Sequence, residues 1–221
     1  MTLSSSCRLN RFFSPGLAAC LLFSCACFAA ETTFQVIDEK GKPVSGAVVM
    51  FTPASGAMAV EPVAIEIIQE DRQFIPGLFI IPVGSRVRFP NHDEVAHHVY
   101  SFSDAKKFDI PLYSGLVPEA VVFDRPGIVT IGCNIHDWMI AHIVVTDTPY
   151  TGKTDEAGSA RIQHLPEVAG KLIVWHPRIR GEAVQHEIIA GPPMPAVTLK
   201  LRPDFRRRLA PAAGDDAGGY R

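Results

Sequence analysis

The stretch GCNIHDWM, residues 132–139, joins two short apolar segments of the chain. It places a thiol, an imidazole and a thioether at Cys133, His136 and Met139, in the spacing C-x2-H-x2-M. Because a loop that closes a β-hairpin brings its two ends together, all three side chains can reach a single ion. The stretch therefore predicts a metal site at the tip of a hairpin, although Met139 beside Trp138 also suits core packing.

A second imidazole is available upstream, in the stretch NHDEVAHHVY of residues 91–100. Two imidazoles and one thiolate in a trigonal set, with a weak axial thioether, form the ligand set of a blue-copper site. Zinc in a structural site takes four firm ligands in a tetrahedron and has no use for a methionine. The combined pattern therefore favours copper.

The first thirty residues have the pattern of a secretory signal peptide. Arg8 and Arg11 precede an apolar run at residues 17–28 that ends in small residues before Glu31. We expect residues 1–30 to be removed and the protein to be periplasmic; the alternative is a lipoprotein signal that leaves Cys20 lipidated. Removal leaves Cys133 as the only cysteine, because the others lie in the leader: Cys7, Cys20, Cys25 and Cys27. A lone thiol in an oxidising compartment is either a small buried apolar residue or a metal ligand.

Composition excludes several classes of protein. The chain is 47% hydrophobic, which argues against disorder, and its 17 Gly and 18 Pro leave little room for long helices. The net charge of −2 comes from well-mixed residues, so we expect no nucleic-acid partner. No segment after the leader approaches the ~18 apolar residues of a transmembrane helix.

Short apolar segments separated by Gly and Pro turns predict an all-β fold built from sandwiches. One helical turn is expected near residues 104–107. The expected strands cover residues 33–36, 47–51, 63–68, 78–81, 86–89, 98–102, 120–123, 128–133, 140–146, 160–162, 172–175, 182–189 and 197–201.

Residues of about 60–147 resemble the cupredoxins, in particular the plastocyanin-like and amicyanin-like electron carriers. The resemblance lies in the FPN of residues 89–91, which leads to the first histidine, and in the FDRPGIVTIGC of residues 123–133. It implies a Greek-key β-sandwich with one copper per chain, and a metal site whose members are His97, Cys133 and His136 as strong ligands and Met139 as the axial ligand. The whole chain is also similar to bacterial methylamine utilization proteins with a plastocyanin-like domain, through HHVYSFS, GCNIHDWM and DTPY.

One position departs from the cupredoxin pattern. Plastocyanin-like domains usually have Asn after the first ligand, and this chain has His98. Adjacent residues of a regular strand point to opposite faces, so we expect His97 to enter the site and His98 to remain outside it. A β-bulge would allow both to bind.

The rest of the chain predicts a second, smaller β-sandwich. VIDEKGKPVSGAVV at residues 36–49 resembles the start of a carboxypeptidase-regulatory-like or transthyretin-like sandwich, and GKTDEAG at residues 152–158 resembles its continuation. Insertion of the cupredoxin domain into this sandwich explains why about a hundred residues separate the two stretches. Such an insertion costs little, because loop-closure entropy rises slowly with loop length. Alternatively the first strands belong to the cupredoxin sheet. The expected division is 31–55, 56–148, 149–202 and a disordered tail at 203–221.

Together these features predict an exported type 1 (blue) copper protein that carries single electrons and is not an enzyme. No nucleophile elbow or paired-carboxylate context surrounds its Ser, His and Asp residues. We expect a transient redox-protein partner to dock on an apolar patch around His136, made of Ile135, Trp138, Met139 and Ile140. The alternatives are a copper storage or delivery protein and a metal-free structural sandwich.

Overall fold

The computed structural model describes residues 31–191 and 194–203. Every regular element in these residues is a β-strand and none is a helix, so the prediction of an all-β chain is confirmed. The described residues accordingly contain no helix that could cross a membrane. The expected signal peptide, and the expected disordered tail apart from Pro203, lie outside the described residues.

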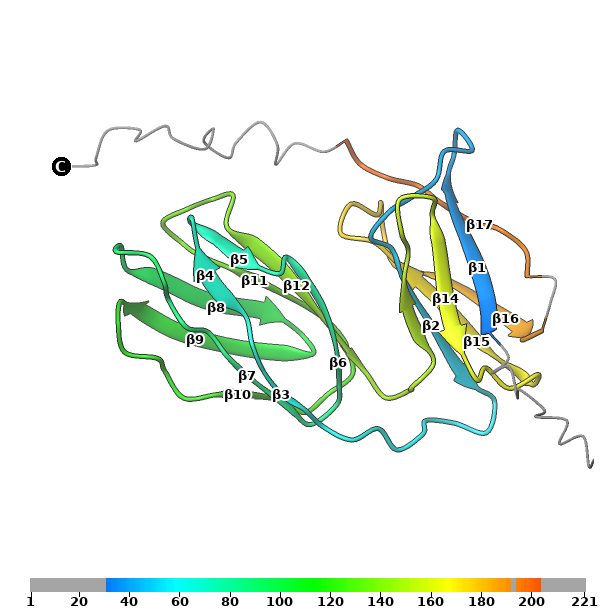
Figure 1. Ribbon diagram of the computed structural model, residues 1–221, viewed down its shortest axis with the longest axis horizontal. Helices are drawn as coiled ribbons and strands as arrows, with labels where there is room; N and C mark the ends of the chain where they lie inside the picture. Colours follow the sequence, from blue (N-terminus) through cyan, green and yellow to red (C-terminus); the bar gives the residue numbers. More distant parts are fainter. Residues whose placement is uncertain (1–30, 192–193, 204–221) are drawn as a thin grey trace, which may run out of the picture.

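The strands gather into two groups that lie side by side (Figure 1), and each group has its own apolar core. The first group contains a five-stranded sheet, in the order β6 (Leu78–Pro82), β12 (Ile140–Thr146), β11 (Gly127–Gly132), β8 (His97–Ser103) and β9 (Lys106–Tyr113). Facing strands form a three-stranded sheet, in the order β10 (Val121–Phe123), β7 (Ser85–Arg88) and β3 (Ala64–Glu66). A two-stranded hairpin completes the group, β4 (Ile68–Glu70) and β5 (Gln73–Ile75).

The core of this first group forms because apolar side chains alternate along the strands of the large sheet. Val129 and Ile131 of β11 and Ile143 and Val145 of β12 are all buried in one cluster. Burial of a side chain of this size stabilises the fold by about 1.5–3 kcal/mol relative to exposure. Cys133, two residues after Ile131 and therefore on the same face, belongs to the same cluster.

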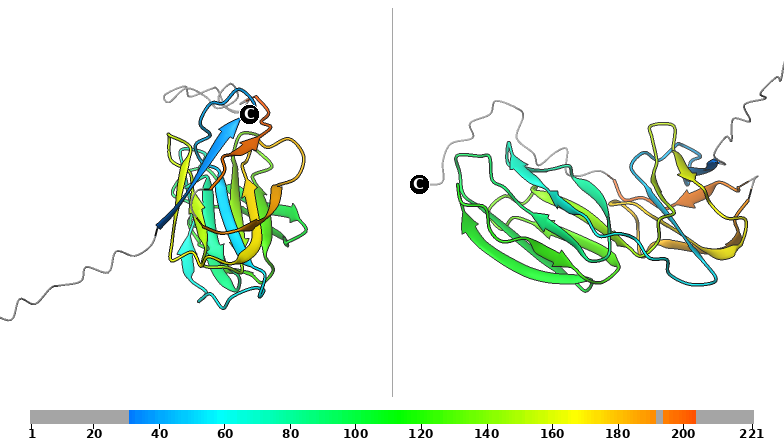
Figure 2. Two further views of the ribbon diagram at one scale, coloured as in Figure 1. Left: turned by 90° about the vertical axis from the view of Figure 1, so that its right-hand side faces the viewer. Right: turned by 60° about the horizontal axis from the view of Figure 1, so that its bottom comes forward.

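The second group joins strands from both ends of the described chain. One sheet has the order β13 (Thr151–Lys153), β2 (Val48–Pro53), β15 (Ala169–Trp175) and β16 (Val184–Ile189). The other has β1 at its centre, antiparallel to one neighbour and parallel to the other: β14 (Ser159–Gln163), β1 (Glu31–Asp38) and β17 (Val197–Leu199). The segment between β2 and β13 forms the first group, as the views in Figure 2 also show.

The two groups meet on the outer face of β12. Val144 is buried in the core of the second group, while Ile143 and Val145 face the core of the first. Beside Val144, the ring of His142 lies 5.2 Å from the ring of Trp175 on β15, in an edge-to-face arrangement. Strand β12 is therefore buried on both faces, which explains its largely apolar sequence.

The helical turn expected near residues 104–107 is wrong. Asp104 and Ala105 form the two-residue turn of a hairpin, and Ser103 pairs with Lys106 across it. Because the side chains that follow alternate between the two faces of a sheet, the segment continues as strand β9 rather than as a helix.

Strands β5, β9 and β13 were not predicted, and the single strand expected at residues 63–68 is divided between β3 and the first residue of β4. Strand β9 contains charged residues and Pro111, which weaken the sequence signal of a strand. It is an edge strand of the five-stranded sheet, and there a proline removes no needed ladder hydrogen bond. Strands β5 and β13 have only three residues each, too few to show alternation.

Candidate metal centre

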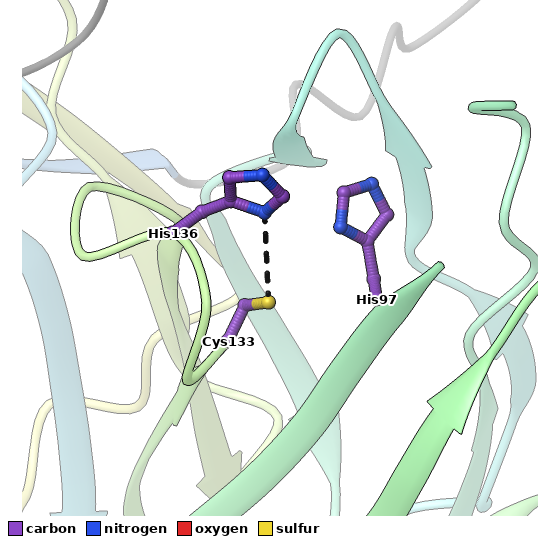
Figure 3. A group of neighbouring side chains, drawn as sticks. All are labelled: His97, Cys133 and His136. Carbon is purple, nitrogen blue, oxygen red and sulfur yellow. Dashed lines mark hydrogen bonds between the residues drawn. The ribbon is translucent and has the colours of Figure 1, made fainter. Parts of the chain in front are cut away.

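Three side chains that could bind a metal converge at one end of the first group. His97 opens β8, Cys133 follows β11, and His136 lies in the loop between β11 and β12. One potential ligand atom from each of the three lies within 4.8 Å of the others. The Sγ of Cys133 is 3.8 Å from Nδ1 of His136, and the two imidazole rings are 5.0 Å apart between centroids. Figure 3 shows the three side chains turned toward a common point.

Backbone hydrogen bonds close the loop that carries two of these residues. Cys133 N–H donates to Met139 O at 3.1 Å, and Met139 N–H donates to His136 O at 2.9 Å. The first bond continues the antiparallel pairing of β11 with β12, which ends at Gly132 and Ile140, and the second closes a turn over residues 136–139. The hairpin thereby brings Cys133 and Met139 side by side with His136 at its tip.

Met139 lies inside the protein. Its exposed fraction is 1%, and it belongs to the same apolar cluster as Cys133. Its backbone carbonyl accepts the N–H of Cys133, so the two residues are neighbours across the hairpin. Met139 therefore contributes nothing to an exposed patch around His136, which corrects that part of the sequence interpretation.

The environment of Cys133 favours a thiolate. Burial by itself raises the pKa of the thiol, but interaction with His97 and hydrogen bonds from the backbone N–H groups of His98 and Ile135 outweigh it. The net result is a pKa below the ordinary value. A thiolate is the form in which cysteine binds metals.

His97 is completely buried and makes one strong contact outside the group. Its Nε2 lies 2.6 Å from Oδ2 of Asp93, whereas its Nδ1 is buried without a hydrogen-bond partner. Burial by itself lowers the pKa of His97, but interactions with Cys133 and Asp93 outweigh it and the pKa is raised. A buried imidazole nitrogen with no partner is costly unless a ligand takes it, and such an atom is what a metal would bind.

His98 does not join the group. Its Nε2 lies 2.6 Å from Oδ1 of Asp109 on β9, and its ring lies 5.2 Å from the ring of Tyr100. The register of β8 against β9 does shift between His97 and Val99. Even with this irregularity His98 lies outside the cluster that contains His97, although its own Nδ1 is also buried without a hydrogen-bond partner.

His136 is the ligand candidate nearest to solvent. It is half-buried, its ring lies 5.3 Å from the ring of Trp138, and its neighbour Ile135 is 49% exposed. Burial, followed by repulsion from His97 and Arg72, lowers its pKa. The neutral imidazole that binds metals is therefore favoured.

The sequence interpretation missed Asp93. Its Oδ1 accepts the N–H of Asp71 at 2.8 Å, and its Oδ2 accepts the N–H of Arg72 at 2.9 Å as well as the contact with His97. Burial raises the pKa of Asp93, but these hydrogen bonds outweigh it and the pKa is lowered. The only sequence signal for this contact was that Asp93 lies four residues before His97. In a loop, that spacing does not predict that two side chains meet.

No protein-family model and no curated protein matches the sequence. A copper-containing nitrite reductase from Thermus scotoductus SA-01 is 28% identical over 42% of this chain and 25% of its own, with a TM-score of 0.35. A purple cupredoxin from Nitrosopumilus maritimus is 25% identical over 37% and 99%, with a TM-score of 0.34. A reduced Cu(I) form of an amicyanin mutant is 18% identical over 44% and 97%, also with a TM-score of 0.34. This chain thus spans about a quarter of the nitrite reductase, and none of these likenesses extends over half of this chain.

Proposed function

We propose that this chain is a cupredoxin-like type 1 copper protein that carries single electrons. His97, Cys133 and His136 would be the strong ligands, and Met139 the weak axial one. The observation that carries the proposal is the convergence of one thiol and two imidazoles within 4.8 Å. The Nδ1 of His97 is buried without a hydrogen-bond partner, as is that of His98, but of these two histidines His97 is the one that belongs to the group.

The donor set favours copper over zinc. A thiolate, two imidazoles and a nearby thioether are the donors of a blue-copper site. A closed zinc site needs a fourth firm ligand, and within the described residues no carboxylate joins the three side chains.

Bound copper would supply one-electron redox chemistry, because it can change reversibly between Cu(II) and Cu(I). The contribution of the chain is to keep the ligands in place during that change. A backbone hydrogen bond ties Cys133 to Met139, and the contact with Asp93 holds the ring of His97. Ligands held in this way need little rearrangement, which favours rapid electron transfer.

Electrons would enter and leave through the exposed edge of His136. Ile135 beside it is 49% exposed, and Leu112 on β9 is 53% exposed. Leu112 adjoins Tyr113, which pairs with His97, so it lies at the same end of the sheet. An apolar surface of this kind suits a small, transient contact with a redox protein. We place this exchange in the periplasm, on the basis of the leader sequence, and assign the chain no catalytic reaction.

The test is a metal analysis and a visible spectrum of the exported protein, with two histidine variants as a matched pair. We expect one copper per chain and intense blue colour that disappears reversibly on reduction. His97→Ala should abolish tight copper binding, whereas His98→Ala should retain it.

Four results would contradict the proposal. Zinc in place of copper, or no metal at all, would overturn the copper assignment. Equal losses in the two histidine variants would mean that His98 also binds the metal. Exchangeable Cu(I) with little blue absorption would instead indicate storage or delivery.

A further inference from the structure

We propose that Asp93 is a positioning residue for the copper site, which orients His97 so that Nδ1 is its ligand atom and strengthens that nitrogen as a donor to Cu(II). This inference rests on the proposed function and deepens it. It assigns a role to a carboxylate that lies outside the set of potential ligands and that contacts one of them directly.

The first support is the contact itself. Oδ2 of Asp93 lies 2.6 Å from Nε2 of His97, and the two side chains are 14% and 0% exposed. A carboxylate can only accept a hydrogen bond, so the Nε2 of His97 must carry the proton. The lone pair of the neutral ring then lies on Nδ1, the atom that is buried without a partner.

The second support is that Asp93 is itself held from several sides. The N–H groups of Asp71 and Arg72 donate to its two oxygens, and its own N–H donates to Oδ1 of Asn91 at 2.9 Å. Asp71 and Arg72 form the turn between β4 and β5, with φ values of 52° and 55°. Both N–H groups of this left-handed turn thus point at one carboxylate, and the hairpin acts as a support for the loop.

Asn91 fixes the other side of the same loop. Its side-chain amide donates to Val95 O at 2.9 Å and to Tyr113 O at 3.1 Å. Tyr113 is paired with His97 across β8 and β9. Asp93 is therefore connected through Asn91 to β9, which pairs with His97, and through the N–H groups of Asp71 and Arg72 to the turn between β4 and β5. A carboxylate held in this way leaves the ring of His97 little freedom to turn.

The consequence for copper is electrostatic. A negative carboxylate on the far nitrogen increases electron density on the imidazole, and Cu(II) gains more from a stronger donor than Cu(I) does. Asp93 should therefore stabilise Cu(II) in preference to Cu(I) and lower the reduction potential. It should also lower the cost of binding, because the ring is oriented before the metal arrives.

The neighbouring histidine provides a control within the same strand. His98 contacts Asp109 through the same pair of atom types at the same 2.6 Å, but Asp109 is 67% exposed and His98 lies outside the cluster. A change at Asp109 alters a His–Asp pair of equal geometry without altering the metal group.

The experiment compares Asp93→Asn, Asp93→Ala and Asp109→Asn with the wild-type protein. Cu(II) and Cu(I) affinities are measured by competition, the reduction potential by voltammetry, and the tautomer of His97 in copper-free protein by ¹⁵N NMR. We expect Cu(II) binding in both Asp93 variants to weaken about ten- to a hundredfold. Cu(I) binding should weaken less, and each tenfold difference between the two raises the potential by about 59 mV.

The tautomer gives a readout that needs no copper. His97 should carry its proton on Nε2 in the wild type and in Asp109→Asn, and should show a mixture of tautomers in Asp93→Ala. If Asp93→Ala fails to fold, Asp93→Asn retains a side chain of the same shape and still reports on affinity and potential.

The outcomes separate the two proposals. A wild-type protein that binds no copper would overturn the proposed function, and the role of Asp93 with it. A blue wild-type protein whose affinity and potential do not change in Asp93→Asn would overturn only the role of Asp93. Equal changes in Asp109→Asn would also overturn it, because the effect would then be one of general charge.

Discussion

Replacing Met139 by Leu distinguishes an axial ligand from a core methionine, because it removes the sulfur and keeps the volume. Met139 is 1% exposed and packed in the apolar cluster that contains Cys133. A volume-conserving exchange at such a position costs less than about 1.5 kcal/mol in the free energy of unfolding. Met139→Ala would instead leave a cavity and cost about 2–5 kcal/mol.

The reduction potential, unlike the stability, should respond clearly to Met139→Leu. The thioether is a weak donor that supports Cu(II), so its loss in Met139→Leu favours Cu(I) and raises the potential. Copper itself should remain bound by the three strong ligands. Met50→Leu provides the matched control, since Met50 is 9% exposed and lies in the core of the second group of strands.

The assay is voltammetry of the copper-loaded variants together with urea unfolding of the copper-free ones. We expect Met139→Leu to raise the potential with little change in stability, and Met50→Leu to leave the potential unchanged. If Met139→Leu has the wild-type potential and spectrum, Met139 is a packing residue and the axial assignment is wrong. An equal shift in Met50→Leu would show that the potential reports on general packing.

Three further predictions concern Cys133, Ile135 and Asp93. Cys133→Ser should abolish blue colour in a folded protein, because the colour needs the thiolate and the sheets do not; a blue variant would refute the thiolate ligand. Ile135→Lys should keep the spectrum but slow electron self-exchange about tenfold or more at low salt, since like charges would meet beside His136; an unchanged rate would place electron exchange elsewhere. The pKa of Asp93 lies below its ordinary 3.8, so its contribution to stability is present above that pH and is lost as the pH falls through the lower folded-state pKa. In copper-free Asp93→Asn, the free energy of unfolding measured with urea should therefore fall less at acid pH than in the wild type. An unchanged pH profile would show that Asp93 makes no such contribution.

The sequence alone was sufficient for the features that depend on local spacing. An all-β chain follows from short apolar segments and frequent turns, because both are properties of neighbouring residues. Cys133, His136 and Met139 could be grouped because one hairpin loop contains all three, and β11 and β12 hold its ends together. The spacing of these residues limits how far apart they can lie, whatever the rest of the chain does.

The tertiary structure decided every feature that depends on direction or on long-range pairing. His97 and His98 are adjacent in the sequence, and only the packing of β8 in the sheet turns one toward Cys133 and the other toward Asp109. Strand β9 became recognisable as an edge strand only from its position beside β8.

Asp93 shows most clearly what the sequence could not decide. Its contacts come from its own loop, from the turn of β4 and β5, and from His97 at the start of β8. Nothing in the spacing of these residues determines that their polar atoms meet, because loop positions carry no fixed side-chain direction. The potential ligands could thus be proposed from residue types and spacing, whereas the groups that orient them depend on the packing of segments distant in the chain.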